Sequence, residues 1–159
     1  MKILVVSDTH NSVMNVFEAI DKLKPDYTFH LGDMAADCEC IQREFPNINF
    51  NAVMGNNDYF GFKRYNYQNE LFVTIDKVKL FMCHGHTYGV KSGLSELKRV
   101  ALLKGADIAL FGHTHTKMCE YTDGIYLVNP GSARSTFALI ETNNGKPDIS
   151  LHSFYELEE

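Results

Sequence analysis

The first third of the chain alternates short apolar runs with helical segments, and this alternation restricts the fold more than any other feature of the sequence. Residues 2–7 form a β-branched, nearly continuous apolar run, which is typical of a strand covered on both faces. The next segment carries apolar residues at helical spacing and ends at Pro25. Strands predicted at residues 27–31 and 50–54 flank a short helix predicted at residues 37–45. This order indicates right-handed βαβ units and a largely parallel sheet.

The pattern changes after residue 70. Residues 71–75 and 78–83 are two predicted strands on either side of the Asp76-Lys77 turn. A helix with an apolar stripe follows and ends at Gly105, and residues 108–111 are another buried strand. The middle of the chain therefore adds strands that need a second surface to pack against.

The last third predicts a β meander, in which Asp123-Gly124 and Asn144-Gly145 are hairpin turns between apolar runs. Neither a linker nor an internal repeat interrupts the sequence, so we expect a single domain over residues 1–159. A compact arrangement for such a chain is two sheets packed face to face, with helices on their outer sides.

Charge and hydropathy exclude some classes of partner. The net charge is −5, from 15 basic and 20 acidic residues, and no run of lysine or arginine is present. We therefore expect no stable complex with nucleic acid. No apolar run is long enough to cross a membrane, so we expect no membrane partner and a cytoplasmic protein. The four cysteines form no disulfide-rich pattern, which fits that compartment.

Residue types that bind metals gather in five short segments, each directly after an apolar run. In open α/β sheets ligands bind at the carboxyl ends of the strands, so we expect these segments to meet at one edge. Asp and Asn are ordinary turn residues, but His is not, and five of the seven histidines fall in these segments. The segments are Asp8-Thr9-His10, Gly32-Asp33, Gly55-Asn56-Asn57-Asp58, His84-Gly85-His86 and Gly112-His113-Thr114-His115.

The mixture of carboxylates, imidazoles and an amide oxygen suits borderline divalent ions. Pure oxygen ligands would indicate Mg²⁺ or Ca²⁺, and thiolates would indicate structural zinc. We expect Mn²⁺, with Fe²⁺, Ni²⁺ or Zn²⁺ as alternatives. The groups are too many for one tetrahedral ion but enough for two ions that share a carboxylate, which is the usual device for displacement at phosphorus. No residue is assigned to an organic cofactor.

The ordered set D-x-H, G-D, G-N-x-D, H-G-H and G-H-T-H resembles the calcineurin-like metallophosphoesterase family. More narrowly, it is similar to the small bacterial and archaeal phosphodiesterases of that superfamily, and the match covers nearly the whole chain. The resemblance implies an α/β fold, a four-layer α/β-β/α sandwich of two packed mixed sheets flanked by helices. It also implies a phosphoric diester hydrolase in which a hydroxide shared by two metal ions attacks phosphorus.

The same resemblance assigns roles to seven residues. Asp8, His10 and His115 would hold the first metal ion, Asn56, His84 and His113 would hold the second, and Asp33 would bridge both. Within this set, Asp33, Asn56 and His84 are the predicted catalytic residues.

One position departs from the family pattern. Many members carry a histidine after the motif asparagine, where it helps the leaving group depart, but here that residue is Asn57. An amide cannot donate a proton as a general acid, so monoesters with poor leaving groups should be poor substrates. His86 has two possible roles: it could contact the substrate phosphate, or it could support a metal-bound histidine as a neighbouring partner. We favour the second role.

Several other features allow more than one interpretation. His30 is expected to be a hydrogen-bonded buried histidine, and His152 a structural or exposed one. The segment Asn129-Pro130-Gly131-Ser132 is either a plain turn or lies near the site, where Ser132 or Arg134 could contact phosphate. The aromatic stretch at residues 59–67 could clamp a nucleotide base or form an interface of a homo-oligomer, and we favour the interface.

The predicted function is hydrolysis of a small phosphate-ester substrate, most specifically a diester. One rival is a scaffold that keeps the fold and works by protein binding, as the retromer subunit of this fold does. The presence of every expected ligand type, including His10, favours an enzyme. A phosphomonoesterase or nucleotidase is the other alternative, and Asn57 argues against it.

Overall fold

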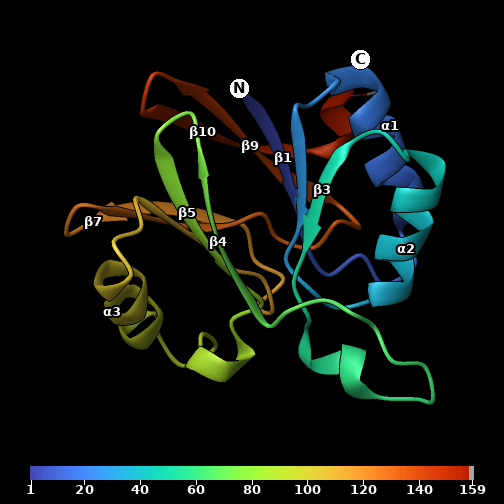
Figure 1. Ribbon diagram of the computed structural model, residues 1–159, viewed down its shortest axis with the longest axis horizontal. Coiled ribbons are helices and arrows are strands. Elements are labelled where there is room, and N and C mark those ends of the chain that lie inside the picture. The colour runs from blue at the N-terminus through green and yellow to red at the C-terminus, as the bar shows by residue number, and fades with distance from the viewer. Residues whose placement is uncertain (158–159) are drawn as a thin grey trace.

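The computed structural model describes residues 1–157 and contains two five-stranded mixed sheets with three α-helices around them. The strand order is β10-β9-β1-β2-β3 in the first sheet and β4-β5-β6-β8-β7 in the second. In Figure 1 the helices α1 and α2 lie on one side of the molecule and α3 lies on the opposite side. Within the described residues, no helix is long and apolar enough to cross a membrane.

The first sheet is built from both ends of the chain. Its parallel core pairs β1 with β2 and β2 with β3, with Ile3 opposite Tyr27 and Tyr27 opposite Asn49. The antiparallel pair β9–β10 extends the other edge, next to β1. Its strands are β1 (Lys2–Val6), β2 (Tyr27–His30), β3 (Asn49–Ala52), β9 (Thr136–Asn143) and β10 (Lys146–Ser153).

The second sheet uses the middle of the chain. Strand β6 pairs in parallel with β5 on one side and with β8 on the other, whereas β4 and β7 are antiparallel edge strands. Its strands are β4 (Glu70–Ile75), β5 (Val78–Cys83), β6 (Ile108–Leu110), β7 (Met118–Thr122) and β8 (Ile125–Asn129).

The strands alternate between two apolar cores, which produces four layers. Ile3 and Val5 of β1 point into the core between the two sheets, while Leu4 and Val6 pack under the helices. The same alternation places Leu80 and Phe81 of β5 on opposite faces. The helices α1 (Val13–Leu23) and α2 (Ala35–Glu44) lie outside the first sheet, and α3 (Ser95–Leu103) covers the second. The expected four-layer α/β-β/α sandwich is confirmed.

Two expectations about topology need correction. The last third is not a meander: the β7–β8 hairpin belongs to the second sheet and the β9–β10 hairpin to the first. The predicted Asp123-Gly124 and Asn144-Gly145 turns are present, with positive φ at all four residues. Neither sheet is largely parallel, because each combines three parallel strands, β1-β2-β3 in the first and β5-β6-β8 in the second, with two antiparallel strands. Periodicity along the chain cannot reveal this, since it does not specify which sheet a hairpin joins.

Candidate metal centre

All five predicted segments follow parallel strands of the two sheets, so their side chains meet at one end of the sandwich. Within each sheet, main-chain hydrogen bonds tie neighbouring segments together. Asp8 N–H donates to Gly32 O at 3.0 Å, and Gly112 N–H donates to His84 O at 2.9 Å. The carboxyl ends of β1, β2, β3, β5 and β6 therefore build one polar cluster, as expected for ligand sites on open sheets.

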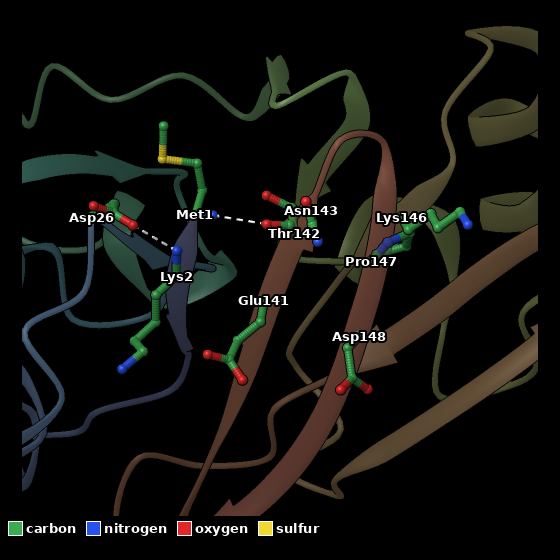
Figure 2. Close-up of a pocket in the computed structure, with 9 residues that line it drawn as sticks. All are labelled: Met1, Lys2, Asp26, Glu141, Thr142, Asn143, Lys146, Pro147 and Asp148. Atoms are coloured by element: carbon green, nitrogen blue, oxygen red, sulfur yellow. Dashed lines mark hydrogen bonds between the residues drawn. The ribbon is translucent and has the colours of Figure 1, made fainter.

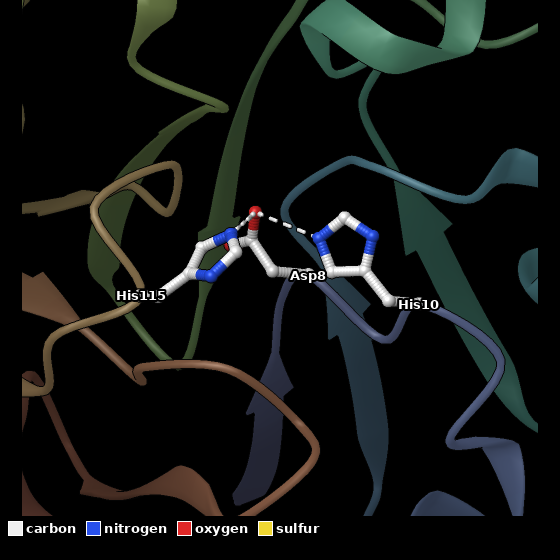
Figure 3. A group of neighbouring side chains, drawn as sticks. All are labelled: Asp8, His10 and His115. Atoms are coloured by element: carbon white, nitrogen blue, oxygen red, sulfur yellow. Dashed lines mark ion pairs between the residues drawn. The ribbon is translucent and has the colours of Figure 1, made fainter.

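Asp8 lies at the centre of the cluster and is fully buried. Its Oδ2 accepts hydrogen bonds from Ser7 Oγ at 2.6 Å and from His113 N at 3.1 Å. Its Oδ1 is buried without a hydrogen-bond donor, 3.1 Å from His115 Nε2 and 4.0 Å from His10 Nε2. Figure 3 shows the two imidazoles on either side of this carboxylate. Together the three side chains form a compact candidate metal-binding triad.

A second triad joins Asp8 and Asp33 to His84. The Nδ1 of His84 lies 2.7 Å from the carbonyl oxygen of Leu31, which can only accept, so Nδ1 carries the proton. In the neutral ring, Nε2 then has a free lone pair. This nitrogen lies 3.1 Å from Asn56 Oδ1, 3.5 Å from Asp33 Oδ1 and 3.8 Å from Asp8 Oδ1.

These atoms fit a divalent cation. Three oxygens and one imidazole lone pair converge on a buried point, and such groups repel one another unless something positive lies among them. The buried Nε2 of His10 likewise has no hydrogen-bond partner. A histidine that donates its other N–H to a backbone carbonyl is the usual arrangement of a metal ligand. The donor set is therefore one that a metal ion would complete.

Asp33 is nearly fully buried and faces both groups of histidines. Its Oδ1 is 3.5 Å from His84 Nε2, and its Oδ2 is 4.0 Å from His10 Nε2. Asn57 donates to both oxygens, from its backbone N–H at 3.0 Å and from its side-chain Nδ2 at 2.7 Å. The predicted shared carboxylate therefore lies between the two histidine groups.

His113 lies beside the cluster but belongs to neither compact triad. Its ring is 5.1 Å from the His84 ring, and its main chain donates to Asp8. Burial, with the neighbouring His84 ring as the next cause, lowers the pKa of His113 below its ordinary value. The structure therefore brings six of the seven predicted ligands into one cluster and places His113 beside it.

Residues 1–145 match the family model described as the calcineurin-like phosphoesterase superfamily domain. This region contains every segment of the cluster. The chain belongs to the calcineurin-like phosphoesterase superfamily.

Relatives in bacteria and archaea support this membership of the superfamily. A Bacillus subtilis protein described as a probable metallophosphoesterase, YsnB, is 29% identical, over 98% of this chain and 91% of its own length. The phosphodiesterase MJ0936 of Methanocaldococcus jannaschii is 32% identical, over 82% of this chain and 83% of its own length. The fold also matches wild-type Vps29 of Entamoeba histolytica in complex with Zn²⁺, with a TM-score of 0.75, 20% identity and coverage of 97% and 99%.

Several residues of the superfamily motifs adopt a left-handed backbone conformation. Asp8, His10, Asp33, His113 and His115 all have positive φ, between 42° and 67°. Residues other than glycine rarely adopt this region, and each such residue costs on the order of 1–3 kcal/mol. Because surrounding contacts must hold these conformations, we interpret the strain as a feature of the site. Residue types alone did not reveal it.

Gly112 shows why the glycine of the G-H-T-H motif is needed. A Cβ at this position would lie 2.0 Å from Ser7 Oγ and 2.7 Å from Asp8 Oδ2. The backbone after β6 thus runs directly against the residues that end β1. Any side chain at residue 112 would push the two loops apart and displace the Asp8 carboxylate, which belongs to both triads.

Asp58 received no role of its own from the sequence, although it lies in one of the five predicted segments. The Asp58 carboxylate is buried and accepts three backbone hydrogen bonds, from Asp33 at 3.0 Å, Gly55 at 2.7 Å and Ala35 at 2.7 Å. It therefore ties the loop after β3 to the loop after β2. Its place in the G-N-x-D motif was the available signal.

The segment after β8 also supports the cluster. The fully buried Asn129 side chain donates to Gly112 O and Thr114 Oγ1, both at 2.9 Å, and accepts from Gly131 N at 2.8 Å. Ser132 Oγ donates to the carbonyl of Asp8 at 2.9 Å. The segment is thus more than a plain turn, because it holds two of the ligand loops. Arg134 is exposed, and its carbonyl accepts from Asn15.

The three remaining histidines have different environments. His30 is buried, accepts from Gly32 N at 3.2 Å and contacts Thr9 Oγ1 at 3.1 Å, which confirms the expected hydrogen-bonded histidine. Burial lowers its pKa to about 4. The His86 ring is 5.4 Å from the His84 ring, and its Nδ1 is buried without a partner. His152 of β10 stacks on Phe137 of β9, as expected for a structural residue.

The aromatic stretch at residues 59–67 lies largely on the surface, with Phe62 fully exposed. Tyr67 contacts Gln42 of α2 at 2.8 Å, which anchors the end of the stretch. The base clamp and the interface predicted for this stretch both remain predictions.

One cavity lies far from the candidate metal centre. A surface hollow of about 570 Å³ opens beside the starts of β1 and β10 (Figure 2). Asp8 follows the other end of β1. Its wall contains Lys2 and Lys146 together with Asp26, Glu141 and Asp148. The Asp26 carboxylate already accepts from Lys2 N at 2.7 Å. With charges of both signs and no histidine among the residues that line it, this hollow offers no alternative to the cluster around Asp8.

Proposed function

We propose that this metallophosphoesterase is a phosphodiesterase that binds two divalent ions per chain and hydrolyses small phosphate diesters. The observation that carries the proposal is the convergence of Asp8, Asp33 and Asn56 oxygens on the lone pair of His84 Nε2. We propose Mn²⁺ as the ion, with Fe²⁺, Ni²⁺ or Zn²⁺ as alternatives, because the ligands mix imidazole with carboxylate.

The proposed ligand sets follow the two sides of the cluster. Asp33 is the shared ligand, which is supported by the distances from its two oxygens to different imidazoles. One ion would be held by Asp8, His10 and His115, and the other by Asn56, His84 and His113. When bound, such ions neutralise phosphoryl oxygens and lower the pKa of water toward neutrality.

The chain's own residues fix how these ligands are presented. Leu31 O holds the His84 ring in one tautomer, and Ser7 and His113 N–H hold the Asp8 carboxylate so that Oδ1 stays free. Preorganised groups of this kind need no rearrangement when charge develops in the transition state. The cluster is therefore suited to binding a phosphate anion in a protein whose net charge is otherwise negative.

The preference for diesters follows from Asn57. Its side-chain amide is engaged with Asp33, and an amide has no acidic proton to give to a leaving group. A hollow of about 160 Å³ beside it is lined by Met34, Ala35, Ala36, Asn57, Asp58, Phe60 and Tyr65. This hollow offers room for one small ester substituent. The phosphodiesterase among the relatives, MJ0936, supports the same preference.

A scaffold of the same fold is the rival function. The likeness to Vps29 concerns the fold alone, and the chain keeps every ligand type of the metal cluster. A metal-reconstituted sample assayed against bis(p-nitrophenyl) phosphate, p-nitrophenyl phosphate and nucleotides would separate the functions. We expect hydrolysis of the diester at the highest rate. No hydrolysis of any ester with metal bound would favour the scaffold, and faster hydrolysis of the monoester would favour a phosphomonoesterase.

A further inference from the structure

Asn57 contacts the Asp33 carboxylate with both its main chain and its side chain. The backbone N–H donates to Asp33 Oδ1 at 3.0 Å, and the side-chain Nδ2 donates to Oδ2 at 2.7 Å. Because a carboxylate only accepts, the amide nitrogen is the atom that must face Asp33. Each Asp33 oxygen therefore has one donor from Asn57 and keeps a lone pair for another partner.

These two contacts determine where the carboxylate points. Oδ1 faces His84 Nε2 at 3.5 Å, and Oδ2 faces His10 Nε2 at 4.0 Å. Among the described residues, Asn57 Nδ2 is the one hydrogen-bond donor to Oδ2. Without it, the carboxylate could rotate about its last bond and turn Oδ2 away from His10.

The neighbouring Asp58 has a different task. Its carboxylate accepts from the backbone N–H groups of Asp33, Gly55 and Ala35, so it fixes the turn, but as an acceptor it gives the Asp33 carboxylate no hydrogen bond. The orientation of that side chain is left to Asn57. Adjacent residues thus hold the main chain and the side chain of the same aspartate.

We propose that Asn57 is a positioning residue, whose side-chain amide holds Asp33 Oδ2 toward His10 and so preorganises the shared carboxylate for a cation. The inference rests on the proposed two-ion function. In this proposal Asn57 acts on the metal ligand Asp33. In the superfamily pattern, the residue at this position is instead a proton donor to the leaving group. Hydrogen-bond partners of metal ligands typically contribute 10–100-fold to metal affinity.

The test is a calorimetric titration of Mn²⁺ into metal-free wild-type protein, Asn57→Ala and Asn66→Ala. Asn57→Ala removes the Nδ2 donor and keeps the backbone donor to Oδ1. We expect the affinity for one ion to fall roughly 10–100-fold. The control, Asn66→Ala, removes an exposed asparagine of the same loop and should bind Mn²⁺ as the wild type does. Asn57→Ser, whose side chain is too short to keep the contact, should repeat the loss if the alanine variant does not fold.

A kinetic measurement distinguishes positioning from contact with the leaving group. Rates of wild type and Asn57→Ala at saturating Mn²⁺ should be compared for aryl phosphodiesters of rising leaving-group pKa. A positioning residue lowers every rate by a similar factor, so the two plots should be parallel. A loss that grows with leaving-group pKa would overturn the inference, as would wild-type Mn²⁺ affinity in a folded Asn57 variant. Absence of Mn²⁺ binding in the wild type would instead remove the two-ion proposal on which the inference rests.

Discussion

The carbonyl of Leu31 accepts a hydrogen bond from Nδ1 of His84 at 2.7 Å, and this contact fixes which nitrogen of the ring can bind a cation. The Nε2 lone pair that results faces three oxygens and no donor from the described chain. Leu31 follows β2 and His84 follows β5, which lie in different sheets, so the contact exists because the sandwich closes at this end.

Purified protein should bind close to two divalent ions per chain. The two triads share Asp8, and Asp33 faces histidines of both groups, so the cluster has ligands for a pair of ions. Elemental analysis after reconstitution with Mn²⁺ would give the stoichiometry, and EDTA should abolish hydrolysis. Metal-free protein whose activity is indifferent to EDTA would contradict the assignment.

Asp33→Asn should damage the whole centre, whereas His10→Ala should weaken chiefly one site. The aspartate faces both histidine groups, and its loss leaves two cations without a shared negative charge between them. We expect a greater loss than the roughly 10–100-fold that removal of a ligand's hydrogen-bond partner costs. Metal titration of both variants measures this. Full occupancy and activity in Asp33→Asn would refute the bridging role.

Hydrolysis by the wild type should depend steeply on the leaving-group pKa. Asn57 cannot act as a general acid, a contribution worth about 10²–10⁴ in rate where one is present. Aryl diesters should be good substrates and alkyl monoesters poor ones. Rates for aryl esters that span several pKa values, at saturating metal, provide the measurement. A flat series with chemistry rate-limiting would reveal a proton donor elsewhere, with His86 as the first candidate because its ring lies beside His84.

Protonation of His30 should destabilise the metal-free protein. Burial lowers its folded-state pKa to about 4, below the ordinary value of 6.5. The unfolded chain therefore binds more protons between these two values, and the free energy of unfolding falls as the pH falls from 6.5 to 4. The full effect is on the order of 3 kcal/mol. Urea titrations in EDTA should show a smaller pH dependence in His30→Gln, and an equal dependence in both proteins would contradict the argument.

Asp58→Ala should destabilise the metal-free protein by on the order of 3 kcal/mol, because three buried backbone N–H groups lose their acceptor. Asp21→Ala is a matched control, since Asp21 forms only an exposed ion pair with Lys24 and should contribute less than about 1 kcal/mol. Urea unfolding of both variants measures the difference. Equal stabilities would show that water replaces the Asp58 carboxylate without cost.

The predicted ligand set was available from the sequence because each ligand follows an apolar run long enough to be a strand. The carboxyl ends of parallel strands meet, so Asp8 and Asp33 could be placed together without knowledge of the fold. The glycines of the motifs were a second local signal, since Gly112 has no room for a Cβ. Residue type, spacing and strand propensity are local properties, and a linear pattern records them directly.

Only the tertiary structure decided how the ligands are held. Ser132 donates to the carbonyl of Asp8 across 124 positions of sequence, and Asn57 reaches Asp33 across 24. Such contacts depend on which strands pair and on how the two sheets pack, and neither is encoded by a local period. The left-handed backbone of Asp8 and His113 arises in the same way, because packing around the loops holds a conformation that neither residue prefers alone. The sequence by itself therefore determined which side chains gather at this end of the sandwich, and the packing of one sheet on the other determined which of their atoms are left without a hydrogen-bond partner.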